Sequence, residues 1–242
     1  MPKFFMPPEK LGERVFLEGE DARHLSRSLR ARVGEKVVIA DGVGNDHAYT
    51  IVGFTKETVE LERTGISRSE GEPQLKVTLF IAAAKGDKTE TMIQKSVECG
   101  AYRIVPFISQ NCVSRPEKGK KTERWNKIAH DAAGQCGRAC PPEVSDVVSF
   151  DEAAREAALI GGAILYEHEE KKFGTYIRKL LFEEKRGELA FLIGSEGGFT
   201  EKEVEKARAA GLASLSLGPR ILRCESVPDF LLGALFAIAE EI

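Results

Sequence analysis

The residues best suited to hold a flat ligand lie near the C-terminus, in two short turns that follow predicted strands. A buried-type strand, Leu189 to Ile193, runs into Gly194-Ser195-Glu196-Gly197-Gly198, and Gly218-Pro219-Arg220 opens a second turn one helix and one strand later. Ligands of parallel sheets settle at the carboxyl ends of the strands. We therefore expect both turns to close on one flat cofactor. Side chains at its rim are predicted to be Glu196, Arg220, Arg223 and Glu225.

The spacing of these glycines excludes two common nucleotide sites. The turns match neither G-x-G-x-x-G nor G-x-x-x-x-G-K-[ST], so a dinucleotide fold and a P-loop are both disfavoured. Between the turns, Thr200 and Glu203 form a T-x-x-E box that predicts a helix start, and Gly211 predicts its end. The two turns are thus separated by one strand-helix-strand unit, and the pair is more specific than either turn alone.

Composition limits the class of protein. The chain has 242 residues, 42% of them hydrophobic, which suits one large or two modest domains. No run of eighteen apolar residues and no signal-peptide pattern occurs, so we expect a soluble cytoplasmic protein without a membrane segment. Its 5 cysteines lack C-x-x-C spacing and are predicted to be reduced thiols, with no metal site.

The formal net charge of −3 gives no overall indication of nucleic-acid binding. Any contact with nucleic acid must therefore come from local groups of basic residues. Two basic runs stand out, and surface solvation is the alternative interpretation of each. The first holds Arg23, Arg27, Arg30 and Arg32, and the second holds Arg115, Lys118, Lys120, Lys121, Arg124 and Lys127.

Residues 1–72 are predicted to form a small β-rich domain. Short strands are expected at 14–17, 36–40, 47–54 and 58–62, with a helix at 21–29 and a hairpin turn at 41–45. Strands of this length closed by Gly and Asp turns favour a small barrel. Thr64 to Pro73, rich in glycine, serine and charge, is predicted to be the linker.

Residues 73–242 are predicted to form an α/β domain. Apolar strands alternate with helical patterns, which indicates βαβ units and a parallel sheet. Expected strands are 77–84, 103–109, 144–149 and 162–166; expected helices are 89–99, 122–134, 151–158, 173–184 and 227–242. Asp87 and Glu90 are placed like a cap, with Gly100 as the stop. The last helix is apolar nearly all round, which predicts burial in the core and against another subunit.

Four segments of the chain resemble a known family. They are K85-G-D-K-T-E-T-M-I-Q-K-S-V-E-C-G100, Q135-C-G-R138, L192-I-G-S-E-G-G-F-T200 and L217-G-P-R-I-L-R-C-E225. Together they resemble the RsmE family, ribosomal RNA small-subunit uracil-N3 methyltransferases of the SPOUT superfamily. The resemblance implies an N-terminal PUA-like β-barrel that binds RNA, then a SPOUT domain whose C-terminal segment forms a trefoil knot. Such knots are rare exceptions to the usual topology rules.

The resemblance also implies S-adenosylmethionine as cofactor, a homodimer, and a uridine near the decoding centre of 16S rRNA in the small ribosomal subunit as substrate. Cofactor contacts carried over by motif are Leu192, Gly194, Glu196 and Gly197 in one loop, Leu217, Gly218, Ile221, Leu222 and Arg223 in another, and His168 in a third. The chain departs from the family pattern at Ser195, where proline is frequent, and at Cys224, where threonine is usual.

Methylation of uracil N3 requires removal of its proton and stabilisation of the resulting anion. Arg138 and Arg223 are candidates for the anion, and Glu225 and Glu196 for the base. The alternative is that each carboxylate only pairs an arginine or caps a helix. Phosphate contacts are expected from Lys3, Arg23, Arg27, Arg30, Arg115, Lys120 and Lys121, with aromatic help from Phe4, Phe5 or Trp125.

Three other functions compete with this prediction. Cys136 could act as the nucleophile of a C5 methylation, although no histidine adjoins it in the sequence. The chain could be a non-catalytic RNA-binding module that dimerises through its knot-type domain. It could also be a metabolic enzyme that uses the Gly-rich turn for a nucleotide, which the missing phosphate-binding pattern disfavours.

Overall fold

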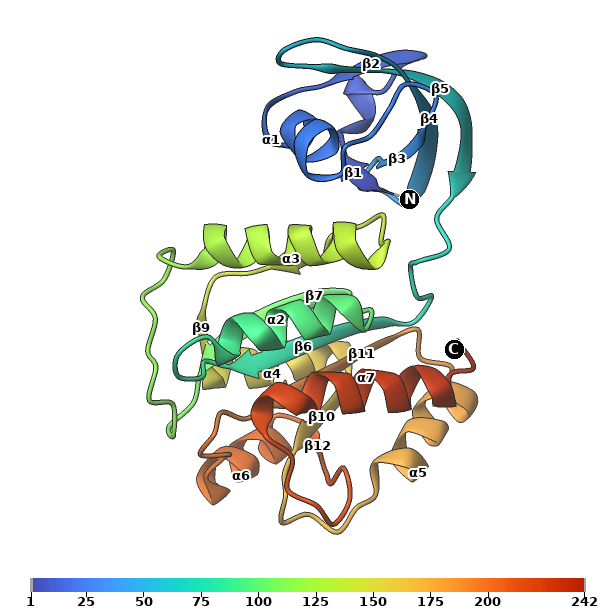
Figure 1. The fold of residues 1–242 in the computed structure, drawn as a ribbon. Helices are drawn as coiled ribbons and strands as arrows, with labels where there is room; N and C mark the ends of the chain where they lie inside the picture. Colours follow the sequence, from blue (N-terminus) through green and yellow to red (C-terminus); the bar gives the residue numbers. More distant parts are fainter. Residues whose placement is uncertain (1, 242) are drawn as a thin grey trace. The chain divides into compact units, whose positions relative to one another are not determined.

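The computed structural model describes residues 2–241, and these fold into two compact units (Figure 1). The first unit comprises Met1–Glu72 with Asp131–Pro141, and the second comprises Pro73–His130 with Pro142–Ile242. A short stretch after the middle of the chain thus belongs to the same unit as the N-terminal strands. The predicted division at 72/73 did not include this stretch.

The first unit is a curled sheet, and among residues 2–241 it has five strands. They are β1 (Lys3–Phe5), β2 (Arg14–Leu17), β3 (Lys36–Ala40), β4 (Asn45–Phe54) and β5 (Val59–Arg68). Their order is β1-β3-β4-β5-β2, with β1 parallel to β3 and the other neighbours antiparallel. Helix α1 (Gly19–Arg23) continues as a π-helical turn, His24–Ser28, and a 3-10 turn spans Pro8–Lys10. The predicted helix at 21–29 is this continuous segment.

Strand β5 corrects the predicted linker. Thr64 to Arg68 was expected to be irregular, yet β5 continues through it because its backbone pairs with β4, with Gly65 opposite Ala48 and Ile66 opposite His47. The glycine and serines there signalled a loop, but the antiparallel ladder with β4 outweighs that local composition.

The sheet of the first unit encloses its own core, and the hairpin turn has a clear cause. Leu25, Ile39, Tyr49 and Leu61 are buried together, and the Tyr49 hydroxyl donates to the Gly12 carbonyl at 2.9 Å. In the turn, Asp41 Oδ1 accepts hydrogen bonds from the amides of Val43 and Asn45, at 2.8 and 3.0 Å. This is the Asx-type turn that aspartate favours.

The second unit is a parallel sheet flanked by helices. Its strands are β6 (Lys76–Ala82), β7 (Arg103–Ile108), β8 (Glu143–Val144), β9 (Val148–Ser149), β10 (Gly162–Leu165), β11 (Glu188–Ile193) and β12 (Ala213–Leu215). Their order is β12-β10-β11-β6-β7-β8, and β9 also pairs with β7. The single strand predicted at 144–149 is wrong: two short strands flank residues 145–147, where the Ser145 amide bonds to the Ile104 carbonyl at 3.0 Å.

Helices alternate with these strands as predicted. They are α2 (Lys88–Glu98), α3 (Thr122–Cys136), α4 (Phe150–Ile160), α5 (Phe173–Arg178) with a π-helical turn Lys179–Glu183, α6 (Glu201–Ala209) and α7 (Val227–Ile238), which follows a 3-10 turn at Cys224–Ser226. Figure 1 shows α2 and α7 on the near face of the sheet and α4 on the far face. The alternation confirms an α/β domain with a parallel sheet.

The helix signals had mixed outcomes. The T-x-x-E box is confirmed, because Thr200 accepts from the Glu203 amide and the Glu203 carboxylate accepts from the Thr200 amide. The Asp87 cap is wrong: its side chain accepts no capping hydrogen bond, and Thr89 instead exchanges hydrogen bonds with the backbone of Ala84. The Thr89 hydroxyl thus ties the first turn of α2 to the end of the segment after β6 and caps no amide of the helix.

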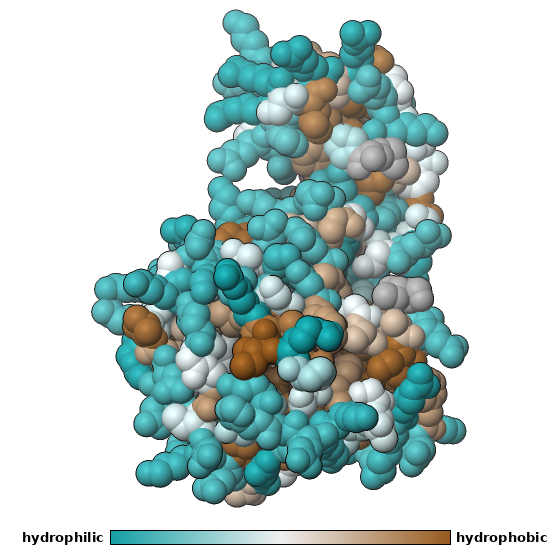
Figure 2. Space-filling model, turned by 60° about the horizontal axis from the view of Figure 1, so that its bottom comes forward, coloured by the Kyte–Doolittle hydropathy of each residue, from teal (hydrophilic) through white to brown (hydrophobic). Residues whose placement is uncertain are grey.

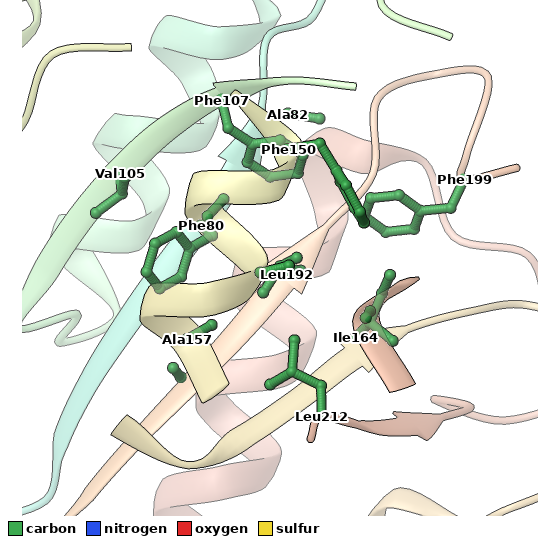
Figure 3. Packing of buried hydrophobic residues seen from close by; sticks show 14 of the residues in the cluster. Phe80, Ala82, Val105, Phe107, Phe150, Ala157, Ile164, Leu192, Phe199 and Leu212 are labelled. Atoms are coloured by element: carbon green, nitrogen blue, oxygen red, sulfur yellow. The ribbon is translucent and has the colours of Figure 1, made fainter. Parts of the chain in front are cut away.

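Between the sheet, α4 and α6 lies a core that supports the strand ends. Phe107 and Phe199 stack with ring centroids 6.2 Å apart, and Phe150 packs against both (Figure 3). Leu192 of β11 is fully buried in the same cluster. Phe199 thereby ties the turn after β11 to the core. The trefoil knot implied by the resemblance stays a prediction.

Candidate functional site

A hollow opens at the carboxyl ends of β10, β11 and β12, where the two turns were expected to meet. Its volume is about 650 Å³ when the open solvent at its mouth is included. Its walls are formed by the segments that follow the three strands. They are Leu165, Tyr166 and Glu167; Ile193, Gly194, Ser195, Glu196, Gly198 and Phe199; and Ser216, Leu217, Gly218, Arg220, Ile221, Leu222, Cys224 and Val227.

The turn after β11 requires glycine at its last position. Gly198 has φ of +60°, and its amide donates to the Ser195 carbonyl at 3.0 Å. A Cβ on Gly198 would lie 2.8 Å from Glu167 Oε1, which comes from the neighbouring strand end. The bare backbone therefore lets the Glu167 carboxylate lie directly against the turn.

The turn after β12 is fixed by its own serine. The Ser216 hydroxyl accepts from the Gly218 amide at 3.2 Å and donates to the Gly218 carbonyl at 3.1 Å. Gly218 has φ of +118°, a conformation that favours glycine. The chain then continues into the 3-10 turn Cys224–Ser226 and α7, whose Pro228 falls in the first turn, as proline can.

Lys88, at the start of α2, connects carboxylates from both turns. Its ammonium lies 3.4 Å from Glu196 Oε1 and 3.7 Å from Glu225 Oε2. Glu196 Oε1 also accepts the Lys85 amide at 3.0 Å. Sequence reasoning missed Lys88, because a lysine at a helix start carries no signal of which distant carboxylates it will meet.

These contacts keep both carboxylates ionised. Burial alone would raise the pKa of Glu196, yet its own amide, the Lys85 amide and the Lys88 ammonium lower that pKa below the ordinary value. The pKa of Glu225 is also lowered, chiefly by its own backbone amide. Burial beside Glu225 raises the pKa of the Cys224 thiol to about 12, so Cys224 stays protonated. Two anions and one cation thus meet beside the hollow, and of these three residues Glu196 lines it whereas Glu225 and Lys88 do not.

The predicted cofactor contacts divide into two groups. Gly194, Glu196, Leu217, Gly218, Ile221 and Leu222 line the hollow. Leu192, Gly197, His168 and Arg223 are not among its lining residues. Leu192 is buried in the core, a Cβ on Gly197 would meet Asn111, and the His168 ring packs edge-on against Tyr166, which does line it. Sequence reasoning missed Glu167, whose position against Gly198 depends on strand order.

Arg138, a predicted catalytic residue, lies in the first unit. It is 4% exposed, and its Nη2 donates to Glu72 Oε2 at 2.8 Å. Glu72 Oε1 also accepts the amides of Ala139 and Cys140, at 2.8 and 2.9 Å. The Glu72 carboxylate thus ties the Gln135–Arg138 motif to the segment that follows β5. The guanidinium is therefore engaged in holding the first unit together. Cys136, the alternative nucleophile, has its thiol 3.6 Å from the Ala133 carbonyl.

A second hollow, in the first unit, is basic on two sides. Arg23 and Arg27 line it from the α1 segment and Lys56 from the β4–β5 turn, with Glu18 and Glu57 at its margin. All three cations are exposed, and none makes a hydrogen bond or ion pair with the residues between 2 and 241. Arg30, nearby on the same segment, is also exposed.

The other predicted RNA contacts are differently placed. The Lys3 ammonium is only 9% exposed and is bound by Asp46 Oδ2 at 2.8 Å and the Gly137 carbonyl at 2.6 Å. Arg115 donates to the carbonyls of Ser109 and Gln110, and Lys120 pairs with Glu117, while Lys121 is half-buried. Phe4 and Trp125, proposed to help with aromatic contacts, are buried and cannot stack on bases.

Two other features are absent from residues 2–241. No cluster of three or more His, Cys, Asp and Glu side chains could hold a metal ion there. No helix in that range is long and apolar enough to cross a membrane.

Comparisons with known proteins agree on one family. The family model described as an RNA methyltransferase domain matches residues 71–236, and an RNA methyltransferase PUA domain matches residues 17–62. Ribosomal RNA small subunit methyltransferase E of Bacillus subtilis is 31% identical over 90% of this chain and 88% of its own length. The Synechocystis protein of that name is 28% identical over 98% of the chain and 78% of its own length.

Solved structures give the same result. Ribosomal RNA small subunit methyltransferase E from Neisseria gonorrhoeae, bound to S-adenosyl methionine, is 32% identical and covers 98% of both chains with a TM-score of 0.88. A Legionella pneumophila protein in complex with the same cofactor is 30% identical and covers 97% of this chain and 96% of its own, with a TM-score of 0.85. The curled N-terminal sheet and the parallel sheet therefore have the fold that the sequence predicted.

Proposed function

We propose a specific reaction for this chain, which belongs to the RNA methyltransferase family of ribosomal RNA small subunit methyltransferase E. The chain is an S-adenosylmethionine-dependent RNA methyltransferase, and its proposed target is N3 of one uridine near the decoding centre of 16S rRNA. The observation that carries the proposal is the hollow at the ends of β10, β11 and β12, formed by the segments that carry the family's motifs.

The hollow suits the cofactor. Leu165, Ile193, Leu222 and Val227 give apolar walls for a flat adenine, and the glycine turns leave backbone amides and carbonyls free of side chains. A Cβ at Gly198 would lie 2.8 Å from Glu167 Oε1 and would displace that carboxylate, which lines the same hollow. The segments 194–199 and 216–222 would hold the cofactor. S-adenosylmethionine supplies an electrophilic methyl group when bound.

The chain's own residues would prepare the uracil. We assign removal of the N3 proton to Glu225, because its carboxylate is ionised and its contact with Lys88, at 3.7 Å, is the longer of the two. Glu196, fixed by an amide and by Lys88, is assigned to positioning the turn. Arg223 is exposed beside Glu225, and its guanidinium is assigned to stabilising charge on the uracil oxygens. Arg138 is assigned a structural role with Glu72.

The substrate and assembly are part of the same proposal. Residues 1–72 are proposed to bind RNA through Arg23, Arg27 and Lys56, and residues 73–242 to carry out the transfer. A homodimer is proposed through α7. Phe230 on α7 is 41% exposed and Ile221 is 82% exposed, and Figure 2 shows apolar side chains gathered among polar ones on one face of the second unit.

The product of the reaction tests the proposal. Unmodified small-subunit RNA, naked or as assembled 30S particles, is incubated with the protein and S-adenosylmethionine, and its nucleosides are then analysed by mass spectrometry. One N3-methyluridine per RNA is the expected result. Formation of C5-methyluridine would instead indicate a mechanism in which Cys136 is the nucleophile. Cofactor and RNA binding without any methyl product would favour the non-catalytic binding module. A Glu225→Gln variant with full activity would overturn the assignment of the base.

A further inference from the structure

The two acidic residues that line the cofactor hollow differ in their surroundings. The Glu196 carboxylate accepts the Lys85 amide at 3.0 Å and lies 3.4 Å from the Lys88 ammonium. Glu167 also lines the hollow, yet its carboxylate forms no ion pair or side-chain hydrogen bond with any residue from 2 to 241. Its negative charge is therefore available to a ligand, whereas that of Glu196 is already neutralised.

The position of Glu167 is set by the fold. It follows β10 directly, and the amide of the preceding Tyr166 donates to the Leu215 carbonyl of β12 at 2.9 Å. Two residues further on, Glu169 is held by Arg208 at 2.6 Å. Glu167 Oε1 itself lies against the bare backbone of Gly198, within 2.8 Å of where a Cβ would be. Strand pairing before it and an ion pair after it thus fix the chain on both sides of Glu167, which lines the hollow.

The Glu167 side chain is exposed, and its uncompensated carboxylate at the wall of the hollow attracts a positive ligand more strongly once the bound ligand excludes water from it. Arg220 is the basic lining residue of the same hollow, and it has no ion pair with the described residues. The hollow thus presents one free anion and one free cation. S-adenosylmethionine carries positive charge on its sulfonium and ammonium groups and negative charge on its carboxylate.

We propose that Glu167 is the counterion for the positive charge of the cofactor and so sets which adenosine compounds the hollow accepts. This inference rests on the proposed function, since it presumes that the hollow binds S-adenosylmethionine. The charge it meets can be the sulfonium, which the reaction removes, or the ammonium, which it leaves. If it is the sulfonium, Glu167 also helps to release the product, because S-adenosylhomocysteine carries a neutral thioether.

Isothermal titration calorimetry at low ionic strength tests the proposal with three compounds. They are S-adenosylmethionine, S-adenosylhomocysteine and the uncharged 5′-methylthioadenosine, measured on the wild type and on Glu167→Gln. Glu170→Gln is the matched control, because Glu170 is exposed on the same loop and does not line the hollow. Glu167→Asp keeps the charge and should retain most of the affinity.

The expected result is a loss of about tenfold in S-adenosylmethionine affinity in Glu167→Gln, with 5′-methylthioadenosine binding unchanged. An unchanged affinity for S-adenosylhomocysteine identifies the sulfonium, and an equal loss identifies the ammonium; both support a counterion. Equal losses for all three compounds, or no loss, would overturn the inference while leaving the proposed function intact. A wild type that binds none of the three would instead refute the proposed cofactor, and the inference with it.

Discussion

The cofactor hollow of the second unit and the basic hollow of the first unit differ in how far their charged side chains are paired. In the second unit, Lys88 pairs with Glu196 and Glu225, and the glycine turns are held by hydrogen bonds of their own. In the first unit, Arg23, Arg27 and Lys56 are exposed and make no such contacts with residues 2–241. The walls of the cofactor hollow are thus fixed by their own contacts, whereas the cations of the basic hollow extend into solvent without partners among residues 2–241.

This difference matches the ligands proposed for the two sites. A small cofactor is bound with less entropic cost by a hollow whose walls are already fixed. A long polyanion is bound by cations that can follow its phosphates and release counterions. Substitutions around the hollow of the second unit should therefore change the affinity for the cofactor, and removal of charge from the first unit should change the affinity for RNA.

The largest effect is expected from Gly198→Ala. The substitution places a side chain at φ of +60° and displaces the Glu167 carboxylate, so we expect cofactor affinity to fall by about 30-fold. Gly86→Ala is the matched control: φ is +69° there, but nothing lies within 4 Å of the added Cβ. It should cost stability and leave affinity unchanged. Equal losses of affinity in the two variants would show that strain, not the shape of the hollow, is responsible.

Removing charge from the basic hollow of the first unit should have the next largest effect. In the double variant Arg23→Gln, Arg27→Gln, RNA affinity should fall by about tenfold, and the slope of log affinity against log salt should decrease by about 1.4. Arg14→Gln is the control, because Arg14 is equally exposed but already pairs with Glu60 and Glu62. Filter binding across a salt series gives both numbers. A salt slope identical to the wild type would remove these arginines from the RNA interface.

Lys88→Gln should have a smaller effect on the cofactor site. Its ion pairs are partly exposed, so we expect cofactor affinity to fall by only about threefold, with recovery in Lys88→Arg. Because the pKa values of Glu196 and Glu225 are lowered, the pairs contribute above the ordinary glutamate pKa and are lost as pH falls through the lowered values. The difference between wild type and variant should therefore vanish in acid.

Lys85→Gln is the control for that measurement, since Lys85 contributes its backbone amide to Glu196 and its side chain is exposed. Titration calorimetry at several pH values compares the two variants. A Lys88→Gln deficit that persists unchanged at acid pH would contradict the role of the ion pairs.

At Ser195 we expect an effect of the opposite sign, on stability. The Ser195 hydroxyl is buried with no hydrogen-bond partner among residues 2–241. Ser195→Ala should therefore raise the free energy of unfolding by about 1 kcal/mol. Ser96→Ala is the contrast, because that buried hydroxyl donates to the Met92 carbonyl at 2.6 Å. Denaturant unfolding of both variants checks the signs, and destabilisation by Ser195→Ala would mean that the hydroxyl has a partner in solution.

Much of the fold could be predicted because its signals are local. Apolar strands alternating with helices gave the parallel sheet, and Thr200 with Glu203 gave the start of α6. Errors occurred where distant backbone decides the outcome. Thr64 to Arg68 is a strand because β4 pairs with it, and Asp87 is not a cap because Thr89 bonds back to Ala84.

The part of the site that could be predicted from the sequence is the part formed by the motifs. The two glycine turns meet as expected, because the strands before them are parallel and neighbour β10. Lys88 and Glu167 were missed, and the partners of Lys3 and Arg138 were not predicted, because the identity of a charged residue does not reveal its partner. Gly198 lies 31 positions from Glu167, Gly137 lies 134 positions from Lys3, and Glu225 lies 137 positions from Lys88.

The division of labour between the two hollows is tested most directly by a crossed binding experiment. Dissociation constants for S-adenosylmethionine and for small-subunit RNA are measured separately on Gly198→Ala and on the Arg23→Gln, Arg27→Gln double variant. Gly198→Ala should lose only affinity for the cofactor, and the double variant should lose only affinity for RNA. If either variant loses both affinities to a similar extent, the two hollows are not separate binding sites.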